Sequence, residues 1–427
     1  MTTPKKSLGG TVRQYGIVGA RFVTSLPFQV LTKGKLLLTT LKKSLGGNVR
    51  QYGIVGALFV IVLLFQVLTH GKLLLPNNLA SLVQQNAYVM ILAIGMVIVI
   101  VAGHIDLSVG SLVALVGGAS ALLMKEVGWP WYLAVIAGLL VGALAGAWQG
   151  FWVAYVGIPA FIVTLGGWLA FRGLAILLVG VTVAGFPGGF ISISNGSVTN
   201  SLGYIANRDV VTLVLGAVTI AALAISQLRS RRTLRKHELQ VEPLTSMVIK
   251  VVLFGAIIGA FTWILAGSRG GTPIVLLIIG VLIVVYSFVM SRTVFGRNVY
   301  AMGGNLQAAI LSGVNTKKMN FWIFVNIGTL AGVAGIVTAS KAGAATANAG
   351  TMYELDAIAA CFIGGTAVTG GIGRVSGVIV GALIMGVLNI GLSIMRVDPA
   401  WQSVVKGVVL IFAVAFDLVN KRRAGGR

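Results

Sequence analysis

The residues that could do chemistry are few, and two of them interrupt an apolar run. Within residues 88–124 the only acidic or basic side chains are His104 and Asp106, in the glycine-rich stretch Gly103–Ser111. A membrane-spanning helix takes about 20 apolar residues, so this run predicts two spans with a polar break between them. A charge at that depth costs several kcal/mol unless protein buries it or water reaches it. His104, Asp106 and Ser108 are therefore candidates for lining a translocation path, as polar breaks do in many transporters.

The same break has a plainer structural interpretation. Asp106 or Ser108 could cap the second helix by accepting a hydrogen bond from a free backbone N–H. Short polar residues just before a helix usually act as caps, so we weigh capping above direct contact with a substrate. The sequence leaves both interpretations open.

The chain lacks the signatures of an enzyme. It contains no G-x-x-x-x-G-K-[ST] motif, so it is not expected to hydrolyse ATP itself. Its three histidines, His70, His104 and His237, form no His/Cys cluster at metal-ligand spacing, and its single cysteine is Cys361. We expect no catalytic residue, metal or cofactor in this chain.

The composition is that of an all-α polytopic membrane protein. Of the 427 residues, 57% are hydrophobic and 10% charged, and 58 are glycines; soluble domains carry about 25% charged residues. Glycine lets helices pack closely in lipid. The net charge of +23 comes largely from 22 of the 32 basic residues, clustered in four segments: 1–50, 229–236, 292–318 and 421–427. Each segment flanks a predicted span, which indicates cytoplasmic loops and not nucleic-acid binding.

The N-terminal region contains a recent duplication. Residues 5–38 recur as residues 42–75, and six of the 34 aligned positions differ. The first copy carries Arg21 and Pro27 where the second carries Leu58 and Leu64. An arginine at a helix centre costs about 2.5–3.5 kcal/mol on insertion, and proline breaks the helix. We therefore expect residues 1–41 to remain cytoplasmic or interfacial and the transmembrane domain to occupy 42–427.

Hydropathy predicts about twelve spans with both termini in the cytoplasm. A second glycine-rich break, residues 370–374, resembles the break at Gly103–Ser111 and indicates two structurally related halves. Arg172, inside a span, needs a partner or a polar cavity. The spans are expected at 52–68, 82–102, 108–124, 132–155, 160–183, 210–228, 247–266, 273–290, 321–339, 358–368 (short enough for a half-helix), 378–395 and 403–418.

Three stretches together resemble a known family. They are Gly103–Ser111, the segment PAFIVTL at 159–165 that contains Thr164, and SRTVFGRNVYAMGGNLQAAILSGVNTKK at 291–318. This combination is similar to the membrane permeases of ATP-binding-cassette sugar importers of the ribose and xylose type. The resemblance runs from about Ser44 to Arg423 and does not address residues 1–41. It adds Thr164 to the candidates for the translocation path.

The resemblance implies a type II importer fold with about 10–12 transmembrane helices and a homodimer of permeases in the bacterial inner membrane. It also implies a cytoplasmic ATPase subunit that binds ATP and Mg²⁺, and a periplasmic sugar-binding protein. Residues 291–318 then match the loop that couples to the ATPase; a loop of this length is uncommon without a function, although a plain basic loop is the alternative. The matching positions are Gly296, Arg297, Ala301, Gly303, Gly304, Asn305, Ala308, Ala309 and Gly313.

A competing function is an ion-coupled secondary transporter of a small polar solute. Such a carrier needs titratable carboxylates at depth, and the candidates among nine acids are Asp106, Glu354 and Asp356. A structural membrane protein without transport is a third possibility. Neutral sugars leave no charge signature in a path, so the sequence does not identify the sugar.

Overall fold

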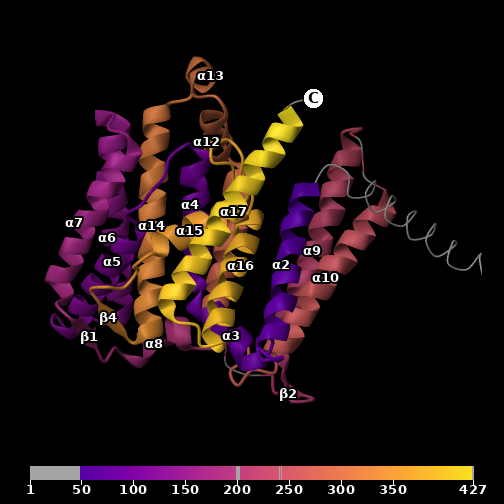
Figure 1. Ribbon diagram of the computed structural model, residues 1–427, viewed down its shortest axis with the longest axis horizontal. Helices are drawn as coiled ribbons and strands as arrows, with labels where there is room; N and C mark the ends of the chain where they lie inside the picture. Colours follow the sequence, from indigo (N-terminus) through magenta and orange to yellow (C-terminus); the bar gives the residue numbers. More distant parts are fainter. Residues whose placement is uncertain (1–48, 199–201, 240, 242, 426–427) are drawn as a thin grey trace, which may run out of the picture.

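The computed structural model describes residues 49–425 apart from 199–201, 240 and 242 (Figure 1). The first copy of the duplication lies outside the described residues. The described chain is a helical bundle in which helices run between two ends, with short connecting elements gathered at each end. The elements are α2 (Val49–Leu68), α3 (Pro76–Gln85), α4 (Ala87–Val101), α5 (Val109–Lys125), α6 (Trp131–Phe151) with a π-helical turn (Trp152–Val156), α7 (Ala160–Val179), β1 (Thr182–Ala184), α8 (Gly188–Asn195), β2 (Tyr204–Ile205), β3 (Arg208–Asp209), α9 (Val210–Lys236), α10 (Leu244–Leu265), α11 (Ile274–Arg292), α12 (Val294–Gly304), α13 (Leu306–Leu311), α14 (Thr316–Ala342), β4 (Ala344–Thr346), α15 (Tyr353–Ile363), α16 (Val375–Ile394) and α17 (Pro399–Gly425).

Among the described residues, seven helices are long and apolar enough to span a membrane by themselves. They are α6 with its π-helical turn, α7, α9, α10, α11, α14 and α16. The pair α3 and α4 is bent by 44° and gives an eighth candidate, and three shorter apolar helices lie in α2, α5 and α17. Each of the twelve predicted spans coincides with one of these helices or with α15, and α15 is the predicted short one, at 11 residues.

The predicted span 82–102 needs a correction at its start. The helix breaks at Asn86 and continues backward as α3 from Pro76, which the sequence analysis placed outside the span. Proline occupies the first position of α3, where its missing N–H costs nothing. The polar residues of α3 obscured this extension in a hydropathy reading.

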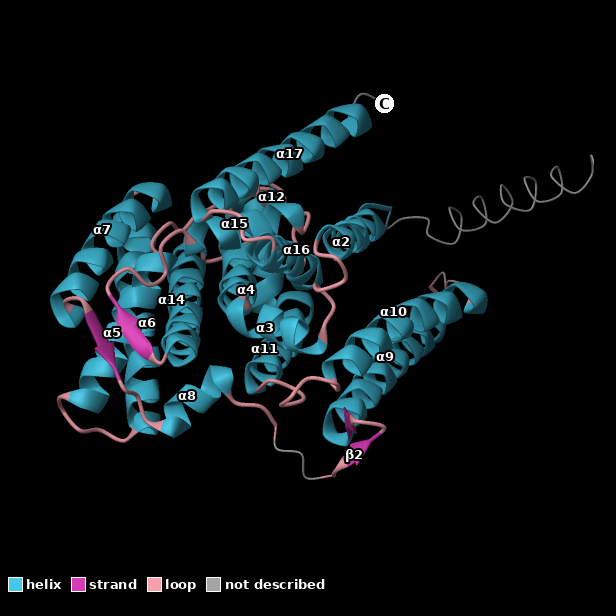
Figure 2. Ribbon diagram, turned by 60° about the horizontal axis from the view of Figure 1, so that its bottom comes forward, coloured by secondary structure: helices cyan, strands magenta, loops and turns pink. Residues whose placement is uncertain are grey.

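Helix α4 forms the centre of the bundle. Every residue of α4 except Tyr88 is buried, and α14, α15, α16 and α11 surround it. A helix that is apolar all round requires such a position, because it has no polar face to offer. By contrast, α9 and α10 pair with each other and stand at the periphery (Figure 2).

Glycines bring α6 and α14 into close contact. A methyl group on Gly146 would lie 3.0 Å from Val325 Cα, and one on Gly328 would lie 2.7 Å from Gly146 Cα. The two backbones therefore touch without intervening side chains, which is the packing expected of small residues in lipid.

Two short antiparallel ribbons were not predicted. Strand β1 pairs with β4, with Val183 opposite Ala345, and β2 pairs with β3. Both ribbons lie at the end of the bundle opposite α13 (Figure 1). Each is only two or three residues long in each strand, too short for a periodic sequence pattern, and the pairing satisfies backbone groups where the chain turns.

Candidate functional site

The break between α4 and α5 is held by a buried polar cluster. Asp106 Oδ1 accepts hydrogen bonds from the Ser108 backbone N–H at 2.8 Å and from the Ser108 hydroxyl at 2.6 Å. Gln149 on α6 donates to Ser108 Oγ at 2.7 Å, and Thr164 on α7 donates to the Ile105 carbonyl at 3.3 Å. Asp106, Ser108 and Thr164 are thus brought to one place by three helices.

This geometry fits the capping interpretation more closely than direct contact with a substrate. Asp106 supports the first turn of α5 through the N–H of Ser108, the residue at its N-cap, while the Ser108 side chain makes no capping bond. Asp106 is 1% exposed, and Ser108 and Thr164 are 0% exposed. The buried cluster therefore holds the chain between α4 and α5 in place through hydrogen bonds. Gln149 was missed by the sequence analysis; an isolated amide in the apolar run of α6 was the available signal.

His104 lies apart from that cluster. One of its ring nitrogens is 3.1 Å from Asn320 Oδ1 on α14, and its ring faces Phe324 with 5.9 Å between centroids. It therefore links the α4–α5 break to α14, not to Asp106. The Arg172 prediction is confirmed: its guanidinium donates to the carbonyls of Ala347 and Ala349, both at 2.7 Å.

The two glycine-rich breaks meet each other and α12 at the end of the bundle that carries α13. The Gly371 N–H donates to the Val101 carbonyl at 2.9 Å, and Tyr300 on α12 donates its hydroxyl to the Gly373 carbonyl at 2.7 Å. A methyl group on Gly303 would overlap the Val101 oxygen and lie 2.7 Å from Gly371 N. We call this backbone contact of Val101, Gly303 and Gly371 the junction. Burial at the junction raises the pKa of Tyr300 above its usual value, so the phenol remains a donor.

The predicted coupling loop forms two short helices, and each has an N-cap side chain. The Thr293 hydroxyl accepts from Gly296 N–H at the start of α12, and Asn305 Oδ1 accepts from Ala308 N–H at the start of α13. Gly313 has a φ of 82°, which favours glycine, and it follows the end of α13.

The glycines of this loop differ in what surrounds them within the chain. A methyl group on Gly304 would meet nothing within 4 Å, which leaves this position open to a partner. The close contacts belong to Gly303 and to Gly296, whose added methyl would lie 2.6 Å from Met290 C. Gly304 is the last residue of α12 and is exposed, so an added side chain there would point into open space.

Most of the remaining loop positions are available to a partner. Arg297, Ala301, Asn305 and Ala308 are exposed, whereas Ala309 is buried. An apolar surface on α13 was not predicted from the sequence: Leu306 is 48% exposed, Ile310 46% and Leu311 88%. Single exposed apolar residues are ordinary, but three on one six-residue helix are typical of a docking surface.

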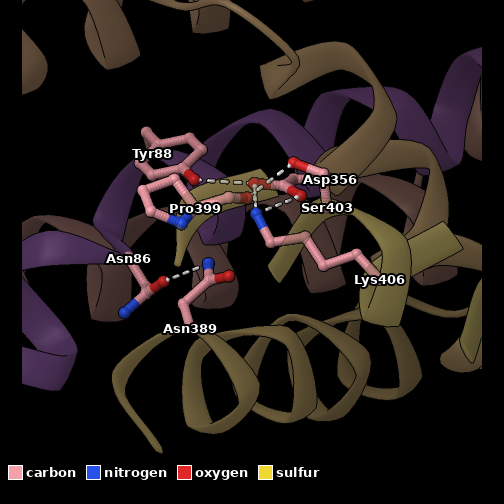
Figure 3. A network of polar contacts seen from close by, with 7 residues as sticks. All are labelled: Asn86, Tyr88, Asp356, Asn389, Pro399, Ser403 and Lys406. Carbon is pink, nitrogen blue, oxygen red and sulfur yellow. Dashed lines mark hydrogen bonds and ion pairs between the residues drawn. The ribbon is translucent and has the colours of Figure 1, made fainter. Parts of the chain in front are cut away.

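A second polar network, not predicted from the sequence, lies nearer the end of the bundle opposite α13. The Tyr88 hydroxyl donates to Asp356 Oδ2 at 2.7 Å, and Lys406 Nζ lies 3.2 Å from both Asp356 oxygens (Figure 3). Beside it, Asn389 donates to Asn86 Oδ1 at 2.8 Å. The network joins α4, α15, α16 and α17, and it pairs one of the carboxylates considered for ion coupling with a lysine.

Comparison with known proteins identifies the family. The model of the branched-chain amino acid transport system / permease component family matches residues 78–414. The chain is 40% identical over 348 residues to the xylose transport system permease protein of Escherichia coli (strain K12), covering 81% of this chain and 86% of that one. The ribose import permease protein of the same organism is 34% identical over 348 residues, covering 81% and 87%.

A third relative is the galactose/methyl galactoside import permease protein of Escherichia coli (strain K12), 30% identical over 362 residues, with coverage of 81% and 88%. No solved structure matches the chain. The polytopic helical fold and the family match at residues 78–414 both indicate a membrane permease. The chain belongs to this permease family, and within it to the ATP-binding-cassette sugar permeases of the xylose and ribose type.

Proposed function

We propose that this chain is the membrane subunit of an importer that moves one monosaccharide, xylose or a related pentose or hexose, into the cytoplasm. The named substrates of its relatives support a sugar of this size. In this proposal a cytoplasmic ATPase subunit binds ATP and Mg²⁺ and hydrolyses the nucleotide. An extracytoplasmic binding protein delivers the sugar, and a second copy of the chain completes the path.

The observation that carries the proposal is the junction. A displacement of α13 reaches α12 directly, and α12 contacts both membrane breaks through Gly303 and Tyr300. The contact through Gly303 is made by backbone atoms, which cannot yield by changing a rotamer. An ATPase that bound the exposed face of α13 in a groove could therefore move the C-terminal end of α4 and the N-terminal end of α16 together.

The proposed orientation places α13 and both chain termini in the cytoplasm of a bacterial cell, with residues 1–41 on the same side. The basic end of α9, the α12–α13 loop and the end of α17 lie at one end of the bundle (Figure 1). Clustered Lys and Arg mark the cytoplasmic side of membrane proteins. His104, Asp106, Ser108 and Thr164 stay candidates for the path in this proposal, at the cytoplasmic break.

The test is reconstitution of the permease with its ATPase and candidate binding proteins in nanodiscs. Xylose, ribose and galactose are compared for stimulation of ATP hydrolysis, and we expect one binding protein with its sugar to stimulate it several-fold. Leu311→Asp should lose the ATPase on purification, because it places a charge in the docking surface. Ser291→Asp, at an exposed position before α12, should retain it.

Two results would contradict the proposal. Uptake that continues with an ATPase-dead partner but collapses with the proton gradient would assign the chain to ion-coupled transporters. Normal retention of the ATPase by Leu311→Asp would place the docking surface elsewhere.

A further inference from the structure

A pocket of about 160 Å³ lies at the end of the bundle opposite α13. It is bounded by the bend between α3 and α4, the end of α14 and the start of α15. The side chains relevant here are Gln84, Gln85, Tyr88, Thr338, Lys341 and Tyr353. None of the residues lining this pocket is acidic.

Two tyrosines form a fixed aromatic wall. The rings of Tyr88 and Tyr353 stack with 3.5 Å between centroids and 13° between planes. The Tyr88 hydroxyl is held by Asp356, which is itself paired with Lys406 on α17 (Figure 3). Asp356 and Lys406 therefore hold Tyr88 in position, although neither residue lines the pocket.

The pocket also offers polar groups that the protein does not use. Gln85 is exposed, and its side-chain amide makes no hydrogen bond among the described residues. The Thr338 hydroxyl is buried and interacts with Tyr353, yet it makes no hydrogen bond of ordinary geometry. By contrast, Lys341 Nζ is engaged, donating to Gln84 Oε1 at 3.1 Å and to Asn195 Oδ1 at 2.9 Å.

We propose that this pocket binds a single monosaccharide ring on its way to the α4–α5 break, an inference that rests on the proposed function. A cavity of about 150 Å³ accommodates one six-membered ring, so the size suits one pentose and not a disaccharide. The tyrosine wall fits the apolar C–H face of a sugar. The amides and the Thr338 hydroxyl fit its hydroxyl groups.

The charges of the pocket disfavour an amino acid. A zwitterion needs an anionic partner for its ammonium group, and a buried charge without a partner is costly. The pocket lining provides no carboxylate, since Asp356 lies behind Tyr88 and is paired with Lys406. The pocket lining therefore disfavours a ligand with an ammonium group, and a neutral sugar carries no such group.

The test is protection of an engineered cysteine in the permease–ATPase complex in nanodiscs, without the binding protein. Ala342→Cys places a thiol in the pocket at an exposed position, and the native Cys361 is buried, which keeps background labelling low. Val127→Cys, 54% exposed in the turn after α5, is the control at the same end. D-xylose should slow maleimide labelling of Ala342→Cys but not of Val127→Cys.

Two further variants in the Ala342→Cys background test the proposed contacts. Gln85→Ala and Thr338→Val each remove one hydrogen-bonding group, and each should raise the xylose concentration for half-protection about 3- to 10-fold. Leucine should give no protection.

The inference is overturned if xylose leaves the labelling of Ala342→Cys unchanged while the same complex, supplied with the binding protein, still hydrolyses ATP in response to xylose. That result would leave the proposed function intact. Protection by leucine and not by xylose would also overturn it. Absence of any sugar-stimulated hydrolysis in the wild-type complex would instead count against the proposed function.

Discussion

The junction can be tested by adding one methyl group. Gly303→Ala places a carbon where the Val101 carbonyl oxygen lies, 2.8 Å from Val101 C and 2.7 Å from Gly371 N. All of these neighbours are backbone atoms, so no side chain can rotate away. The backbones must separate, and the hydrogen bond from Gly371 N–H to Val101 O, 2.9 Å long, is lost with them.

The cost follows from two contributions. Overpacking a close contact costs about 1–3 kcal/mol, and leaving a buried backbone group without its partner costs about another 1–3 kcal/mol. Every 1.4 kcal/mol changes a population about tenfold. Even the low end of this range, about 2 kcal/mol, lowers the population with an intact junction more than tenfold relative to a separated one.

The assay compares sugar-stimulated ATP hydrolysis and uptake in proteoliposomes for wild type, Gly303→Ala and Gly304→Ala. The last variant is the matched control, because a methyl group on Gly304 meets nothing within 4 Å. We expect Gly303→Ala to retain the ATPase and basal hydrolysis but to lose at least tenfold in uptake per ATP hydrolysed. Gly304→Ala should stay within about twofold of wild type. Wild-type uptake by Gly303→Ala would refute the junction as the route of coupling.

Two further predictions concern the buried polar groups. Asp106→Asn keeps the acceptor oxygen for Ser108 and should retain most uptake. Asp106→Leu leaves the Ser108 N–H and hydroxyl without an acceptor, so it should lower the free energy of unfolding by about 1–3 kcal/mol and the yield of folded protein, measured by melting temperature and expression. Equal melting temperatures of the two variants would contradict the capping role. Lys406→Met leaves the nearly buried Asp356 without its cation and should lower the free energy of unfolding by up to about 3–5 kcal/mol. The loss should be smaller than this range, because the lysine side chain is 25% exposed and solvent screens the pair. Adding Asp356→Asn to Lys406→Met should recover much of the lost stability. A double variant as unstable as the single one would show that the charge is not the cause.

Single residues illustrate how much of the site can be predicted from the sequence. It showed that Arg172 needs a partner, but not that two loop carbonyls after β4 provide it. It singled out Asp106 and Ser108, yet it did not reveal Gln149, which completes their cluster from α6. The Tyr88–Asp356 bond joins residues 268 positions apart, and neither residue carries a local pattern that names the other.

The sequence by itself determined the membrane class, the approximate positions of the apolar helices in the described chain and the two polar breaks. These are properties of one segment against lipid, summed residue by residue, and no other part of the chain is needed to evaluate them. Only the tertiary structure decided between the adjacent Gly303 and Gly304, and only it brought Tyr88, Tyr353 and Thr338 around one pocket. Contacts of that kind depend on which helices pack together and at what rotation, and in a bundle of apolar helices many arrangements satisfy the same hydropathy.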